Sequence, residues 1–159
     1  AAATGAVGVL RHDPMAMKPF MGYSVDQYFQ HWIDMGKKVP ADKQPKIFNV
    51  NWFRTDDEGN FIWPGFGDNM RVLNWIIDRC EGKADAEETA IGYVPKPEDI
   101  DLTDLDMDLD TLKSILKVDK DVWTKEAEEI EEHYKKFGDK LPQELREQLG
   151  NLKANLAKM

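Results

Sequence analysis

Apolar side chains recur every three or four residues in several stretches of this chain, and turn-forming residues separate the stretches. The first stretch follows Ser24, a favourable N-cap, and stops at Gly36, which suits a left-handed helix end. One face of this segment carries Val25, Tyr28, Phe29, Trp32 and Ile33. Because this spacing aligns the apolar side chains in one stripe, it predicts an amphipathic helix between Ser24 and Gly36.

A second helix is predicted directly after residue 67. Asp68 or Asn69 can cap its start, and Gly82 ends it. The predicted apolar face consists of Val72, Leu73, Ile76, Ile77 and Cys80. Cys80 is the only cysteine, which excludes an internal disulfide and a cysteine-rich zinc site. Its place on the apolar face predicts a buried, inert thiol.

Three further helices are predicted near the C-terminus. A short one has apolar positions at 109, 112, 115 and 116. A longer one extends from Val122 to Phe137, where Gly138 stops it. Pro142 begins the last helix, whose leucines at 145, 149, 152 and 156 repeat at alternating four- and three-residue spacing.

Strand signals occur in the first half of the chain. Residues 47–53 form a short run rich in aromatic and β-branched side chains, and residues 61–63 form a second apolar run. A polar turn at 55–60 separates the two runs, so we expect a hairpin over residues 47–63.

The remaining segments show weaker patterns. Residues 9–23 are expected to contain a short strand and then a turn-rich segment with Pro14 and Pro19. Residues 83–110 are expected to be irregular and acidic. The predicted fold class is therefore α+β, with short strands and a hairpin, flanking helices and a helical C-terminal tail.

Composition narrows the classes of protein that the chain can represent. Of its 159 residues, 42% are hydrophobic and 10% aromatic, which is enough for the core of one domain or of part of a larger one. The net charge of −9 argues against a protein that binds nucleic-acid backbones. No apolar run approaches the roughly 20 residues of a membrane helix, and no signal peptide is evident. We expect a soluble, cytoplasmic protein without a membrane partner.

The N-terminal segment, residues 1–8, consists mainly of alanine and glycine and lacks an initiator methionine. Two interpretations are open: a piece of a mobile loop, or a cloning remnant at a frayed end. We expect that the chain was cut from a longer one.

A run of alternating aspartates resembles the start of a calcium loop. The candidate ligands are Asp104, Asp106, Asp108 and Asp110. Position 6 of such a loop is Leu109 instead of glycine, and position 12 is Ile115 instead of glutamate. The run is therefore expected to be a solvated acidic face, and no metal site is predicted in this chain.

The three histidines are far apart in sequence, and none has metal-ligand spacing. His31 and His133 lie in predicted helices, so we expect structural or surface roles for both. His12 lies in a loop beside the small-residue start, and its role stays open.

The segment from Trp52 to Asn69 carries an unusual set of aromatic residues. Rings on a hairpin usually form core, but Phe66 lies between Gly65 and Gly67, where a planar molecule can approach closely. Two rings could sandwich a purine base, a contact worth about 1–3 kcal/mol. The Asn69 amide has both a donor and an acceptor, as the edge of guanine requires. No phosphate-binding glycine loop accompanies this candidate base site.

Several runs resemble the C-terminal part of GTP-dependent phosphoenolpyruvate carboxykinase, and the similarity covers essentially the whole chain. They are residues 11–23 (RHDPMAMKPFMGY), 45–54 (PKIFNVNWFR), 61–73 (FIWPGFGDNMRVL) and 91–95 (IGYVP). The resemblance implies an enzyme that converts oxaloacetate and GTP to phosphoenolpyruvate, carbon dioxide and GDP in gluconeogenesis, with Mn²⁺ and Mg²⁺. The full enzyme is expected to be a monomer.

The same resemblance assigns roles to individual residues. It implies that guanine lies between Phe53 and Phe66, with Phe61 at its edge, and that Asn69 reads the base. The backbone of Phe66, Gly67 and Asp68 is expected to join this GTP/GDP contact. The implied domains are a remnant of the active-site lid at 1–8, part of the nucleotide-binding domain at 9–97, and an acidic loop with C-terminal helices at 98–159. The lid remnant comprises Ala1, Ala2, Ala3, Thr4 and Gly5.

The resemblance also implies which parts of the enzyme are absent from this chain. The phosphate-binding loop, the metal ligands and the substrate-binding arginines belong to the missing N-terminal part, which would be a partner of this segment. No catalytic residue is therefore predicted here, and the chain alone is expected to be inactive. The alternative is a non-catalytic, acidic helical module that binds another protein.

Overall fold

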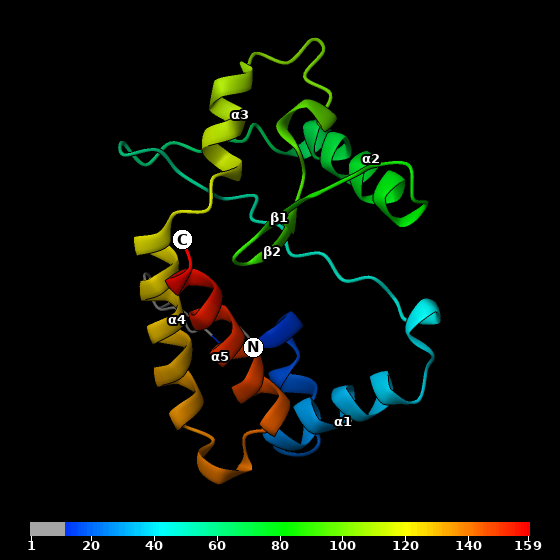
Figure 1. Ribbon diagram of the computed structural model, residues 1–159, viewed down its shortest axis with the longest axis vertical. Helices are drawn as coiled ribbons and strands as arrows, with labels where there is room; N and C mark the ends of the chain where they lie inside the picture. The colour runs from blue at the N-terminus through cyan, green and yellow to red at the C-terminus, as the bar shows by residue number, and fades with distance from the viewer. Residues whose placement is uncertain (1–11) are drawn as a thin grey trace. The chain divides into compact units, whose positions relative to one another are not determined.

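The computed structural model describes residues 12–159 and divides into two compact units (Figure 1). Unit 1 is formed by the described residues up to Gln44 together with Lys120–Met159, and unit 2 is the continuous segment Pro45–Asp119. Helices and one small sheet occur within residues 12–159, so the predicted α+β class is confirmed. The predicted lid remnant, residues 1–8 with Ala1 to Gly5, lies outside the described residues, as does the start of the segment 9–23 in which a short strand was expected.

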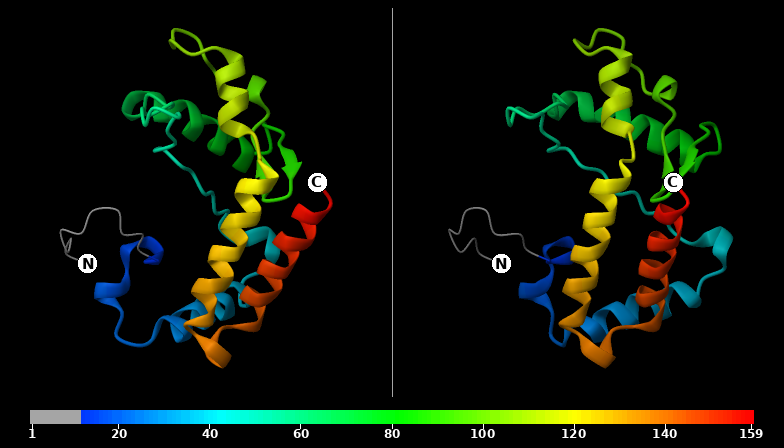
Figure 2. Two further views of the ribbon diagram at one scale, coloured as in Figure 1. Left: turned by 90° about the vertical axis from the view of Figure 1, so that its left-hand side faces the viewer. Right: turned by 60° about the vertical axis from the view of Figure 1, so that its left-hand side comes forward.

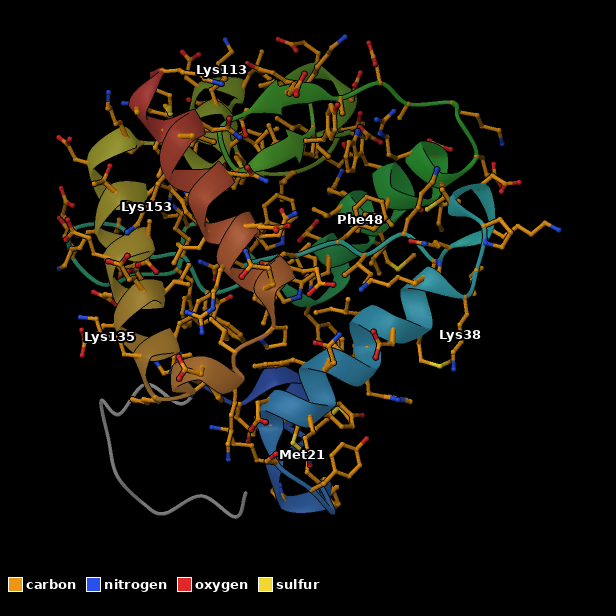
Figure 3. All side chains as sticks on the ribbon, turned by 60° about the horizontal axis from the view of Figure 1, so that its bottom comes forward. Met21, Lys38, Phe48, Lys113, Lys135 and Lys153 are labelled. Atoms are coloured by element: carbon orange, nitrogen blue, oxygen red, sulfur yellow. The ribbon has the colours of Figure 1, made fainter. Side chains whose placement is uncertain are left out.

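Unit 1 contains three of the predicted helices: α1 (Val25–Lys37), α4 (Lys120–Lys135) and α5 (Gln143–Ala157). Helices α4 and α5 lie side by side, as Figures 1 and 2 show. Lys153 of α5, labelled in Figure 3, forms an ion pair with Glu131 of α4 at 2.7 Å. The buried apolar residues of this unit include Ala127, Leu141 and Leu156.

Helix α1 begins as predicted but does not end as predicted. Ser24 precedes it in an extended conformation, whereas Gly36 lies inside the helix and has no left-handed backbone. The helix continues to Lys37, and Pro40 follows three residues later. Because a proline disfavours the helical conformation of the residue before it, Pro40 explains the end of α1 better than Gly36 does.

Unit 2 contains α2 (Asn69–Cys80), α3 (Leu109–Leu116) and a two-stranded antiparallel sheet of β1 (Glu87–Thr89) and β2 (Gly92–Val94). Helix α2 ends shortly before Gly82, as predicted. The φ of Gly82 is 74°, the left-handed conformation in which glycine commonly ends a helix. At the other helix, Asp108 caps α3 because its carboxylate accepts a hydrogen bond from the Thr111 backbone at 2.7 Å.

The hairpin predicted over residues 47–63 is wrong. Residues 47–53 form no strand, and the only pairing in the segment is an isolated bridge between Thr55 and Phe61. The observed strands lie at 87–94, inside the segment predicted to be irregular. Each strand has only three residues, which is too short for an alternating pattern to be recognised.

The core of unit 2 explains what the apolar residues near 47–53 do instead. Its buried members are Trp63, Trp75, Ile100 and Leu112. Phe48, labelled in Figure 3, packs its ring edge-on against Trp75 of α2, with the centroids 6.2 Å apart. Phe48 and Trp52 therefore contribute to this core from a loop, without a sheet partner.

The buried face of α2 differs from its prediction. Trp75 is buried and Val72 and Ile76 pack against the core, but Leu73, Ile77 and Cys80 are exposed. The expectation of a buried Cys80 thiol is therefore wrong, because the helix turns Trp75 to the core and Cys80 away from it. No helix within residues 12–159 is long and apolar enough to cross a membrane.

Candidate functional site

The loop before α2 holds Phe66 in a strained and fully exposed position. Its backbone φ is 45°, a left-handed value that side chains other than glycine rarely adopt, and its side chain is 99% exposed. Gly65 before it has φ 77° and ψ −167°, a conformation that is essentially restricted to glycine. Strain at an exposed aromatic residue is characteristic of a functional position, because packing does not require it.

Alanine at Gly65 is expected to destabilise the protein by about 1–2 kcal/mol, because a Cβ is strained at this φ. Gly67 offers a matched control two residues away: it has open space around its Cα and no positive φ. We expect Gly67→Ala to change the free energy of unfolding by less than about 0.5 kcal/mol. Urea unfolding of both variants provides the measurement, and equal effects would contradict the backbone argument.

Phe53 and Phe61, two more of the predicted site residues, lie close to each other. Both rings are exposed and their centroids are 5.8 Å apart, with a tilt of 59° between their planes. The turn between them is fixed by Asp56, whose carboxylate accepts hydrogen bonds from the backbone of Glu58 at 3.0 Å and Asn60 at 2.8 Å. These bonds, chiefly that from Asn60, lower the pKa of Asp56. The turn therefore presents two neighbouring rings at the surface of unit 2.

Asp68 and Asn69 at the start of α2 are both engaged by neighbouring side chains. Asp68 accepts a hydrogen bond from Arg71 Nε at 2.9 Å, and Arg71 also donates to the carbonyl of Asp101 at 2.8 Å. Asn69 Oδ1 accepts a hydrogen bond from the indole Nε1 of Trp63, at 2.8 Å. The sequence placed Trp63 in the aromatic segment but did not indicate this bond, because a contact six residues apart across a loop has no spacing rule.

The acidic segment after β2 uses its carboxylates locally. Asp101 accepts a hydrogen bond from the Thr103 backbone at 2.8 Å, and Asp108 is the cap of α3. Within residues 12–159, no three histidine, cysteine or acidic side chains are grouped so that they could hold a metal ion.

Unit 1 brings together two histidines that the sequence did not pair. The rings of His12 and His133 stack with their centroids 3.9 Å apart and 17° between their planes. Burial is the main reason that the pKa of His133 is lowered, and the charges of His12, Lys136 and Lys18 add to the effect. Its Nδ1 is buried and has no hydrogen-bond partner among the described residues, which also disfavours protonation.

This histidine pair predicts a loss of stability in mild acid. The unfolded chain binds a proton at the ordinary histidine pKa of about 6.5, whereas folded His133 resists protonation until a lower pH. Its contribution is therefore complete above pH 6.5 and declines as the pH falls through the folded pKa. Urea midpoints at pH 7.5 and 5.5 should show a decline that His133→Gln reduces. The control is His31→Gln, because His31 is exposed on α1; this variant should show the same decline as the wild type. If His31→Gln reduces the decline and His133→Gln does not, His133 is not its cause.

A family model and individual proteins that are similar to this chain carry the same name. Residues 1–155 match the family described as phosphoenolpyruvate carboxykinase C-terminal P-loop domain. Three similar curated proteins are named phosphoenolpyruvate carboxykinase [GTP]. The protein from Renibacterium salmoninarum is 54% identical over 98% of this chain, and that from Arthrobacter sp. is 53% identical over 99%. The protein from Treponema pallidum is 52% identical over 94% of this chain.

These relatives are much longer than the chain. The match covers 26% of the Renibacterium and Arthrobacter proteins and 24% of the Treponema protein. The chain thus spans about a quarter of the length of the curated relatives that it matches.

Proposed function

Because this chain belongs to the family of phosphoenolpyruvate carboxykinase C-terminal P-loop domains, we propose that it supplies the guanine-binding site of a GTP-dependent carboxykinase. The whole enzyme would convert oxaloacetate and GTP to phosphoenolpyruvate, carbon dioxide and GDP. We place this reaction in gluconeogenesis in the cytoplasm and expect the enzyme to act as a monomer. Its partners would be a guanine nucleotide and the N-terminal part of the same protein.

The observation that supports this proposal best is the position of Phe66. A ring that is 99% exposed on a left-handed backbone contributes little to folding, but it is available to stack on a base. Phe53 would cover the opposite face of guanine and Phe61 its edge, while the backbone of Gly67 and Asp68 completes the contact. The aromatic residues and Asn69 all belong to unit 2, so one compact segment carries the proposed base site.

The chain alone is expected to be inactive. Phosphoryl transfer requires cations that neutralise charge on the transferring group. Mn²⁺, Mg²⁺ and the phosphate groups of GTP would be held by the N-terminal part of the enzyme. Residues 1–5 would belong to the active-site lid, which closes over the substrates in the complete protein.

The first test is a titration of the chain with GDP, GTP and ATP, followed by tryptophan fluorescence. Trp52 and Trp63 lie in the same segment as the proposed site and should report on binding. Saturable quenching by the guanine nucleotides, with a much weaker response to ATP, is expected. An equal response to ATP would contradict the proposal and favour the alternative of a protein-interaction module.

A second test addresses the reaction itself. Formation of phosphoenolpyruvate from oxaloacetate and GTP with Mn²⁺ is expected from the full-length protein and not from this chain. Turnover by the purified chain would refute its predicted inactivity, and no turnover by the full-length protein would refute the proposed reaction.

A further inference from the structure

We propose that Trp63 is a positioning residue that fixes the orientation of the Asn69 amide and thereby selects purines with a carbonyl group at position 6. The inference rests on the proposed function of the base site. The main observation in its support is the hydrogen bond of 2.8 Å that the indole Nε1 of Trp63 donates to Oδ1 of Asn69.

The chemistry of the two groups leaves only one orientation. An indole nitrogen can donate a hydrogen bond but cannot accept one, so the oxygen end of the amide must face Trp63. The opposite end of the amide is therefore Nδ2, which carries two donors. Within residues 12–159, Asn69 Nδ2 donates to no protein atom, so it is available to a ligand.

Both partners are held by the fold. Trp63 is 6% exposed and belongs to the core of unit 2 with Trp75, Ile100 and Leu112. Asn69 is the first residue of α2, whose Trp75 belongs to the same core. The amide orientation is thus tied to the hydrophobic core, so rotation of the amide would break a bond to a buried donor.

A fixed amide discriminates between bases that a free amide would accept equally. The Nδ2 donor of Asn69 matches the O6 acceptor of guanine and of hypoxanthine. Adenine presents an amino group at the same position, so two donors would face each other. Without the Trp63 bond, the amide could rotate by 180° and offer its oxygen to the amino group of adenine.

The test compares two single substitutions of the same kind in the full-length protein. Trp63→Phe removes the indole N–H that binds Asn69. Trp75→Phe is the matched control: Trp75 is 5% exposed in the same core, and its Nε1 has no hydrogen-bond partner among the described residues. Calorimetric titrations with GDP, IDP and ADP give the ratio of affinities for each protein.

We expect the wild-type protein to prefer both GDP and IDP to ADP. Trp63→Phe should lower both preferences by about 3- to 10-fold, as expected for the loss of one hydrogen bond. Trp75→Phe should leave the ratios unchanged. If Trp63→Phe does not fold, benzothienylalanine at position 63 keeps the shape of the side chain and lacks the N–H.

The outcomes separate this inference from the proposed function. Equal weakening of all three nucleotides, with unchanged ratios, would mean that Trp63 is merely structural and would overturn the inference. Unchanged ratios with full affinity would overturn it as well, while the proposed function would stand. A wild-type protein without preference for GDP over ADP would overturn both.

Discussion

Replacing Phe66 with alanine is expected to raise the dissociation constant of the chain for GDP by about 5- to 150-fold. The range corresponds to the 1–3 kcal/mol that stacking of one base on an aromatic ring contributes. The Phe66 side chain is 99% exposed, so its removal leaves no cavity in the folded protein and should not change the free energy of unfolding appreciably. Calorimetry on the wild type and the variant provides both dissociation constants.

Tyr93→Ala is a suitable control for this substitution. Tyr93 of β2 also has an exposed aromatic ring in unit 2, but it lies outside the proposed base site. GDP affinity should be unchanged in this variant. If Phe66→Ala binds GDP as tightly as the wild type, stacking on Phe66 is refuted even if the other rings bind the base.

Leu112→Ala is expected to lower the free energy of unfolding by about 2–5 kcal/mol. Leu112 of α3 is 3% exposed and packs in the same cluster as Trp63 and Trp75, so its truncation leaves a cavity in the core of unit 2. Urea unfolding followed by tryptophan fluorescence reports directly on this cluster, because two of the five tryptophans are buried in it and Trp52 packs against it.

Ile77→Ala provides the comparison at an exposed site. Ile77 lies on α2 and is 50% exposed, so the same type of truncation should cost less than about 1 kcal/mol. Similar losses in the two variants would show that Leu112 does not occupy a tightly packed core.

The helices were predictable because their apolar residues repeat at helical spacing, although Gly36 did not mark the end of α1. Leu112 and Leu156, both on predicted apolar faces, are buried in the structure. Strand prediction failed at residues 47–53, where aromatic residues reach the core from a loop. Local pattern does not distinguish these two arrangements, because both require large apolar side chains.

The sequence indicated which segment carries the candidate base site, but not the backbone conformation or the contacts of its residues. Phe66 between two glycines was visible in the sequence, but the positive φ at Phe66 itself was not. The bond between Trp63 and Asn69 and the stack of His12 on His133 depend on how the chain folds back on itself. Such contacts follow no spacing rule, so the residues could be singled out but not paired.

The division of the chain has a consequence for the order in which it folds during synthesis. Unit 2 is one continuous segment, so all of its core residues have left the ribosome once residue 119 has emerged. Unit 1 cannot be completed until its second half has been synthesised, since Lys37 of α1 pairs with Glu144 of α5, which is 107 residues later. Because local contacts close faster than distant ones, the segment with the proposed base site can fold while α1 still lacks its partner.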